Sequence, residues 1–159
     1  MKLVALYNHT PNLPYGLLYI ASYLRERGIR VQMFDDVGKM MRCRPEIIGI
    51  SNMFTEDSEK VLGTCKFIKA HIDTKIVLGG NHASCFAKEL SEYDFIDHVV
   101  IGEGERAMLD IARGSKEKII QRDMLDIDLI SMPAYDLVDM RKYLGGNPFC
   151  MRYPTLGII

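Results

Sequence analysis

Short apolar runs alternate with helix-patterned segments along most of the 159 residues of this chain. Each run is too short to be a helix of ordinary length, and each is rich in valine, isoleucine and leucine or other apolar residues. Nearly continuous apolar strands are typical of a parallel sheet that helices cover on both faces. The alternation therefore predicts an α/β fold with a doubly wound, five-stranded parallel sheet. The expected strands are residues 3–7, 31–34, 47–51, 75–78 and 98–101.

The end of this alternation divides the chain. Gly114 follows the last helix-patterned segment, and glycine is a common C-terminal cap, so we expect one α/β domain over residues 1–114. Residues 115–154 read as a possible edge strand at Ile119-Ile120 and a linker that lies over another part of the molecule. Residues 155–159 begin a new strand with no later sequence to pair with, which is the pattern of a chain cut at a domain boundary.

Composition excludes several classes of function. The formal net charge is −1, so no broad basic surface favours nucleic acid or anionic lipid as a partner. No apolar run approaches the roughly 18 residues of a membrane span, and no charged-then-apolar signal peptide opens the chain. We therefore expect a cytoplasmic protein without a membrane partner.

Two expected strands end in glycines. Residues 76–78 run into Gly79-Gly80, and residues 99–101 run into Gly102-x-Gly104. Glycine at a strand end is kept where a ligand or another backbone must approach the main chain closely. The carboxyl edge of a parallel sheet is a common ligand site, although two tight turns without a ligand explain the glycines equally well. A dinucleotide fingerprint after the first strand and a P-loop are both absent from the sequence.

The ordered set of motifs resembles one family. Residues 14–24, 79–84, 101–105, 132–137 and 156–159 are similar, in the same order, to segments of cobalamin-dependent radical S-adenosylmethionine enzymes. The resemblance implies that this chain is their N-terminal, flavodoxin-like (Rossmann-like) cobalamin-binding domain. It also implies that residues 155–159 begin a radical S-adenosylmethionine barrel, which would be the missing C-terminal partner domain.

The resemblance also implies the cofactors. In the family a C-x-x-x-C-x-x-C loop that follows the first barrel strand holds a [4Fe–4S] cluster, and this chain contains no such loop. We therefore expect cobalamin in this chain, no catalytic residue, and a [4Fe–4S] cluster and S-adenosylmethionine only in a longer parent. The parent would be a methyltransferase or a cyclase.

The first loop departs from the cobalamin modules of mutases and methionine synthase. Those modules carry D-x-H-x-x-G, whose histidine ligates cobalt, whereas this chain reads Asn8-His9-Thr10-Pro11-Asn12-Leu13. Ser51-Asn52-Met53 and Gly79-Gly80 resemble the later S-x-L and G-G elements of those modules. The combination implies a base-off cobalamin, with its nucleotide tail buried and no protein histidine on cobalt, and hence no metal ligand in the chain itself.

The expected binding residues follow from the resemblance. Glycines 79 and 80 would admit the tail, Ser51 would hydrogen-bond its benzimidazole, and His82 would contact corrin amides or the tail phosphate. Glu103 and Glu105 would accept hydrogen bonds from corrin amides. Turns, caps and core packing remain alternative roles for these residues. The full set is Thr10, Pro14, Tyr15, Gly16, Ser51, Met53, Phe54, Gly79, Gly80, His82, Gly102, Glu103, Gly104 and Glu105.

Two rival functions remain open. The first is a degenerate Rossmann-like module that keeps the fold for structure or interaction and binds no corrin. The second is the N-terminal domain of a radical methylthiotransferase, which would hold an auxiliary cluster on three cysteines. The cysteines of this chain, Cys43, Cys65, Cys85 and Cys150, follow no common metal-binding spacing, and Cys65 falls in the middle of an expected helix.

Overall fold

A single parallel sheet organises the chain in the computed structural model, which describes residues 2–126, 128 and 130–144. The strand order is β2-β1-β3-β4-β5-β6, and every neighbouring pair is parallel. Order 2-1-3-4-5 is the flavodoxin-like arrangement, so the α/β prediction is confirmed. The strands are β1 (Leu3–Tyr7), β2 (Arg30–Phe34), β3 (Ile47–Ser51), β4 (Lys75–Gly79), β5 (His98–Ile101) and β6 (Ile119–Gln121).

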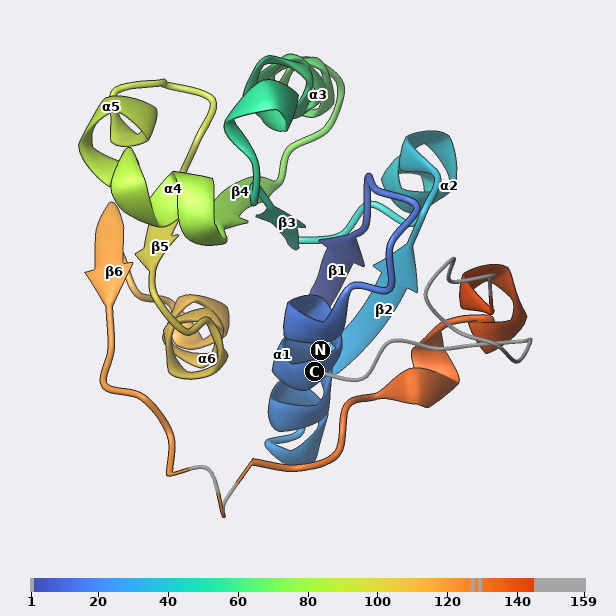
Figure 1. The fold of residues 1–159 in the computed structure, drawn as a ribbon. Helices are drawn as coiled ribbons and strands as arrows, with labels where there is room; N and C mark the ends of the chain where they lie inside the picture. The colour runs from blue at the N-terminus through green and yellow to red at the C-terminus, as the bar shows by residue number, and fades with distance from the viewer. Residues whose placement is uncertain (1, 127, 129, 145–159) are drawn as a thin grey trace.

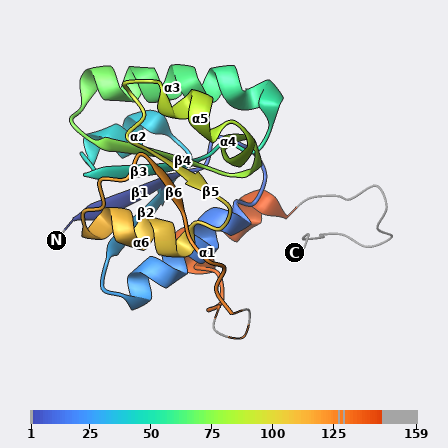
Figure 2. The same cartoon turned by 90° about the vertical axis from the view of Figure 1, so that its left-hand side faces the viewer.

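Helices cover both faces of this sheet, as Figures 1 and 2 show. Two helices lie on one face and pack against each other, α1 (Tyr15–Glu26) and α6 (Glu105–Arg113). The other face carries α2 (Val37–Arg42), α3 (Ser58–His71), α4 (Asn81–Cys85) and α5 (Ala87–Ser91). Short 3₁₀ helices occur at η1 (Thr55–Asp57), η3 (Tyr135–Leu137) and η4 (Met140–Tyr143).

Successive side chains of each strand point to opposite faces of the sheet, so each face has its own hydrophobic core. In β1, Val4 and Leu6 face α1 and α6, whereas Ala5 faces α2 and α3. The same alternation in β4 sends Val77 to the first core and Leu78 to the second. Position 79 therefore belongs to the α1/α6 face, which fixes where a side chain at Gly79 would point.

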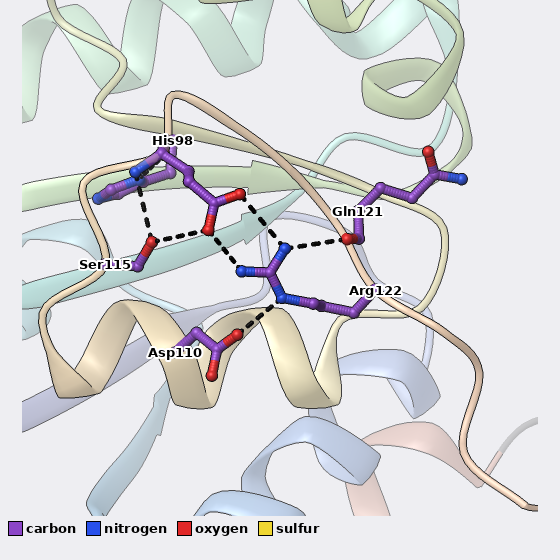
Figure 3. A network of polar contacts seen from close by, with 6 residues as sticks. His98, Asp110, Ser115, Gln121 and Arg122 are labelled. Atoms are coloured by element: carbon purple, nitrogen blue, oxygen red, sulfur yellow. Dashed lines mark hydrogen bonds and ion pairs between the residues drawn. The ribbon is translucent and has the colours of Figure 1, made fainter.

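The prediction of five strands was wrong by one. Residues Ile119–Gln121 extend the sheet by pairing with β5, with Val99 opposite Ile119. Their short length made them only a possible edge strand in the sequence. A polar network on the sheet edge anchors this strand, and Figure 3 shows it. The Arg122 guanidinium contacts Asp110 Oδ2 at 2.7 Å through Nε and Glu117 Oε1 at 2.5 Å through Nη2.

The segment after β6 returns across α1 toward β2 (Figure 1). The Ala134 amide donates to Leu18 O at 3.1 Å, and Ala134 is buried in the core beside α1. Further along, Lys142 Nζ lies 2.6 Å from Asp35 Oδ2. Residues 115–144 thus pack on the α/β domain where they are described, while the strand expected at 155–159 and the cysteine at 150 lie outside the described residues. In the described part, no helix is long and apolar enough to cross a membrane.

Candidate functional site

A cavity of about 420 Å³ opens at the carboxyl edge of the sheet, between the strand ends and the two helices α1 and α6. Ser51 and Gly79, the last residues of β3 and β4, line it from the sheet. Leu17 and Ile20 line it from α1, and Met108 lines it from α6. This volume falls in the range of small-molecule sites, roughly 300–1,000 Å³, and an apolar lining with a few polar groups is typical of them.

Two glycines shape the floor of this cavity in different ways. An added Cβ at Gly49 would lie 2.8 Å from Leu6 Cδ2 and 3.2 Å from Met108 Cε, so Gly49 allows the core to close beneath the cavity. An added Cβ at Gly79 would meet only Val100 Cβ, at 3.8 Å, which is ordinary contact. The missing side chain at Gly79 therefore leaves space that a ligand can fill.

Gly80 has a different role from Gly79. Its φ is +99°, in the region that favours glycine, and an added Cβ would lie 2.9 Å from Asn52 O and from Met53 Sδ. A side chain at position 80 would therefore collide with the loop after β3. Both glycines were expected to admit a ligand or to form a tight turn, and at Gly80 the backbone conformation itself requires glycine.

Ser84 joins the two glycine-bearing strand ends. Its hydroxyl donates to Gly80 O at 2.9 Å and accepts from the Gly102 amide at 3.0 Å. Gly102 also has a positive φ, +75°. Next to it, an added Cβ at Gly104 would lie 2.6 Å from Ile20 Cδ1, so glycine lets the start of α6 approach α1 closely. These contacts hold the cavity mouth in shape.

Glu105 places a carboxyl group in the cavity wall. It is the first residue of α6 and only 7% exposed, whereas Glu103 is exposed. Burial raises the pKa of Glu105, and the neighbouring charge of Glu103 raises it further. The opposing influence of the backbone N–H at Glu105 is smaller than that of burial.

None of the four histidines of the chain lines the cavity. His9 Nε2 lies 2.8 Å from Ser51 O, so this ring is held on the backbone of the β3 end. His82 Nδ1 lies 3.0 Å from Thr55 Oγ1, and its ring stacks on Phe86 at 4.6 Å between centroids. His98 begins β5, at the opposite edge of the sheet, and His71 is an exposed residue of α3.

Nine of the expected site residues line the cavity together. They are Gly16, Ser51, Met53, Gly79, Gly80, Gly102, Glu103, Gly104 and Glu105. The other five lie outside its lining. Thr10 bonds to Asn8 Oδ1 within the first loop, and Pro14 and Tyr15 form the start of α1. Phe54 is 51% exposed on the loop after β3, which excludes the alternative that it is a core residue.

Sequence reasoning missed the apolar half of the lining. Leu17, Ile20 and Met108 have the helical spacing that also marks ordinary core residues, so the pattern gave no signal that they face a cavity. Helix α4 (Asn81–Cys85) begins directly after Gly80, and the sequence analysis assigned no element to these residues.

The three cysteines in the described part of the chain do not form a cluster site. Cys65 is fully buried in α3, and burial raises the pKa of its thiol to about 12. Cys43, which follows α2, and Cys85, at the end of α4, are exposed. Within residues 2–126, 128 and 130–144, no group of three or more histidine, cysteine, aspartate or glutamate side chains could hold a metal ion.

The chain matches a known family over most of the α/β domain. The family model described as "B12 binding domain" matches residues 2–112. A methyltransferase of Pyrococcus horikoshii described as uncharacterized, PH0819, is 31% identical and aligns with 88% of this chain and 37% of its own length. The hopanoid C-2 methylase of Rhodopseudomonas palustris is 26% identical and aligns with 84% of this chain and 27% of its own length. The chain therefore spans well under half of these relatives.

Solved structures share the fold. TsrM of Kitasatospora setae, a radical S-adenosylmethionine methyltransferase with cobalamin and a [4Fe–4S] cluster bound, matches with a TM-score of 0.60 and 23% identity, over 71% of this chain and 24% of TsrM. OxsB, a cobalamin-dependent S-adenosylmethionine radical enzyme with aqua-cobalamin bound, matches with a TM-score of 0.58 and 18% identity, over 82% of this chain and 20% of OxsB.

Proposed function

We propose a mode of cobalamin binding for this chain, which belongs to the B12-binding domain family. The cavity at the carboxyl edge receives the nucleotide tail of cobalamin, and the corrin ring lies over the cavity mouth. Cobalamin is held base-off, without a protein histidine on cobalt. The observation that carries this proposal is the cavity itself, which is open between α1, α6 and the strand ends.

The residues around the cavity fit this cofactor. The floor at Gly79 leaves room for a flat aromatic base, and Leu17, Ile20 and Met108 offer apolar side chains to its faces. Burial of a dimethylbenzimidazole group against such walls is favourable by roughly 25 cal/mol for each Å² of apolar surface removed from water. The Ser51 hydroxyl, at the β3 end, is a donor for the base.

The corrin ring would rest on the exposed rim. Met53 and Phe54 are 39% and 51% exposed there, and burial under a large ring would compensate for that exposure. Glu103 is exposed at the start of the turn before α6 and can accept hydrogen bonds from corrin amides. Thr10, Pro14, Tyr15 and Gly16 would form the loop beneath the ring, and His82 would offer Nε2, since Nδ1 already faces Thr55.

The positions of the histidines support the absence of a histidine ligand. His9 follows the end of β1 and His82 follows the end of β4, so both lie near the carboxyl edge of the sheet. One ring nitrogen of each already contacts a protein oxygen, Ser51 O for His9 and Thr55 Oγ1 for His82. Neither lines the cavity. Bound cobalamin would supply a carrier for a methyl group, and the chain would bind and orient the cofactor and exclude water from its tail.

We further propose that the chain is the N-terminal domain of a radical S-adenosylmethionine enzyme, as a methyltransferase or a cyclase. The names of the relatives PH0819, hopanoid C-2 methylase and TsrM support a methyltransferase. Residues 1–114 would be the cobalamin domain, 115–154 an edge strand and linker, and 155–159 the start of the barrel. The barrel would carry the [4Fe–4S] cluster and S-adenosylmethionine, in a cytoplasmic enzyme without nucleic-acid or membrane partners.

The experiment is retention of the cofactor. The chain is incubated with hydroxocobalamin, desalted, and its absorbance spectrum and cobalt content are measured. We expect close to one cobalt for each chain, with the spectrum of the base-off form. Loss of all cobalt on desalting, together with no heat of binding in calorimetry, would favour the degenerate module that binds no corrin. A longer parent protein should contain the C-x-x-x-C-x-x-C loop and bind iron.

A further inference from the structure

Glu105 is a buried carboxyl group without a partner side chain. It lies in the cavity wall at 7% exposure, beside Met108 of the same helix. In the described part of the chain no side chain pairs with its carboxyl group, whose oxygens are not among the fully buried atoms that lack a partner, and neither lysine, arginine nor histidine lines the cavity. A carboxyl group in such a place has few ways to be satisfied by protein alone.

The surroundings of Glu105 favour its protonated form. Removing an ionised carboxylate from water is costly unless a charge or several hydrogen bonds compensate. Burial is the largest influence on Glu105 and raises its pKa, and Glu103 acts in the same direction. A ligand that filled the cavity would remove the remaining water, so Glu105 would then need either an acceptor for its own proton or a donor from the ligand.

The tail of base-off cobalamin brings the complementary group. When the benzimidazole leaves cobalt, one ring nitrogen loses its metal and becomes a hydrogen-bond acceptor. If that nitrogen is buried in an apolar cavity without a donor, it carries the full penalty of an unsatisfied polar atom. The protonated Glu105 carboxyl group thus lacks a hydrogen-bond acceptor, and the ring nitrogen of the base lacks a donor.

We propose that the Glu105 carboxyl group receives the ring nitrogen of the displaced base in one shared-proton hydrogen bond, and so selects cobamides whose base carries such a nitrogen. This inference rests on the proposed function. One proton lies between the Glu105 oxygen and the base nitrogen, no covalent bond forms or breaks, and the net charge of the pair is unchanged wherever the proton resides. A cobamide whose lower base is a phenol has no ring nitrogen to place there.

This role differs from the one that the sequence suggested for Glu105. Corrin amides project around the outer edge of the ring, where Glu103 is exposed. Glu105 is buried in the cavity wall, which Ile20 of α1 and Met108 of α6 also line. The two glutamates of the same turn therefore serve two different parts of one cofactor.

The test compares two cobamides in wild type and in variants of the 159-residue chain. Dissociation constants are measured for cobalamin and for a phenol-type cobamide with wild type, Glu105→Leu, Glu105→Gln and Ser51→Ala. Glu89→Leu, at an exposed position of α5, is the matched control. Circular dichroism and melting temperature check that each variant folds.

We expect Glu105→Leu to weaken cobalamin binding by about tenfold, because the base nitrogen loses its donor, and to leave binding of the phenol-type cobamide within about threefold. Glu105→Gln keeps an N–H donor and should restore most of the affinity for cobalamin. The control should match wild type with both ligands.

Four outcomes would overturn the inference. Equal losses for both cobamides in Glu105→Leu would mean that the side chain only shapes the cavity. A selective loss in Ser51→Ala, with none in Glu105→Leu, would assign the base nitrogen to Ser51. If wild type binds neither cobamide, the proposed function fails as well, whereas normal cobalamin binding without selectivity leaves that function standing and removes only the role of Glu105.

Discussion

Gly79 lies across the cavity floor from Val100, and a Cβ on Gly79 would stand 3.8 Å from Val100 Cβ. That separation is an ordinary van der Waals contact, so a side chain at position 79 would not collide with the protein. It would instead occupy the space that is open to a ligand. The neighbouring Gly80 shows the opposite relation, because an added Cβ would lie 2.9 Å from Asn52 O. These two positions allow the binding role to be separated from the folding role.

Gly79→Val should abolish cobalamin retention while the chain stays folded. The branched side chain would point to the α1/α6 face and fill the space beneath the tail. We expect cobalamin affinity to fall by more than about tenfold, since tail burial would be lost. Binding is measured by calorimetry and folding by circular dichroism.

Gly63→Val is the matched control, because Gly63 has nothing within 4 Å of an added Cβ and lies on α3, away from the cavity. It should bind cobalamin as wild type does. Full retention of cobalamin by Gly79→Val would mean that the tail does not pass over the end of β4.

Gly80→Val should instead destabilise the fold. A β-branched residue at a φ of +99° is strained, and its Cβ would collide with the backbone of Asn52. We expect the free energy of unfolding in urea to fall by about 1–3 kcal/mol. An unchanged free energy together with lost cobalamin would show that position 80, like position 79, limits the ligand rather than the fold.

Arg122→Ala should loosen the edge of the sheet. Arg122 joins Asp110 of α6 to Glu117, which precedes β6, and its side chain is 28% exposed. Because the partners are more exposed, solvent screening keeps the loss of unfolding free energy small, and the loss should shrink in high salt. Arg141→Ala is the control. Arg141 is 86% exposed and pairs with the nearby Asp139 in the described part of the chain, so Arg141→Ala should lower the free energy of unfolding less than Arg122→Ala does. Equal effects of the two substitutions would mean that the network does not anchor β6.

His98 should make the fold sensitive to acid. Its Nδ1 donates to Glu117 O at 2.6 Å, and Nε2 is buried without a partner in the described part of the chain. Burial lowers the pKa of His98 below its ordinary value of 6.5. The unfolded chain therefore binds the proton more readily, so the stability from neutral His98 is full above pH about 6.5 and is lost as the pH falls below it.

The measurement is the free energy of unfolding between pH 5 and pH 7.5. His98→Asn keeps an N–H for Glu117 O but does not titrate, so its stability should fall less than that of wild type as the pH drops. His71→Asn, at an exposed position, should keep the wild-type slope. Glu105 affects wild type and the variants alike, so it cancels in the comparison. Identical slopes for wild type and His98→Asn would contradict the assignment.

The regular part of the fold was readable from the sequence because strand composition and burial agree there. Strands β1, β3 and β5 begin and end where their apolar runs do, at residues 3–7, 47–51 and 98–101. Strand β6 has only three residues, and its place is fixed by pairing with β5 and by the ion pair of Arg122 with Asp110 of α6. Neither contact leaves a local pattern, so the sixth strand could not be assigned with the others.

The glycines of the site could be predicted from the sequence, but the apolar residues that line the cavity could not. Gly79 and Gly102 stand out because a strand end rarely needs them, whereas Leu17 and Met108 look the same whether they face a core or a cavity. Glu105 was equally ambiguous. A carboxylate in the first turn of a helix is usually a surface residue stabilised by the helix dipole, and only the packing of α6 shows that this one is buried.

The central claim is that this chain holds cobalamin base-off, in the cavity beside Gly79, without a histidine on cobalt. The most direct measurement is the electron paramagnetic resonance spectrum of the desalted complex with cob(II)alamin. The account predicts one bound cob(II)alamin with no nitrogen superhyperfine splitting, since neither the benzimidazole nor a histidine would ligate the metal. A clear nitrogen triplet would contradict it, and loss of that triplet in His9→Ala or His82→Ala would identify a protein ligand.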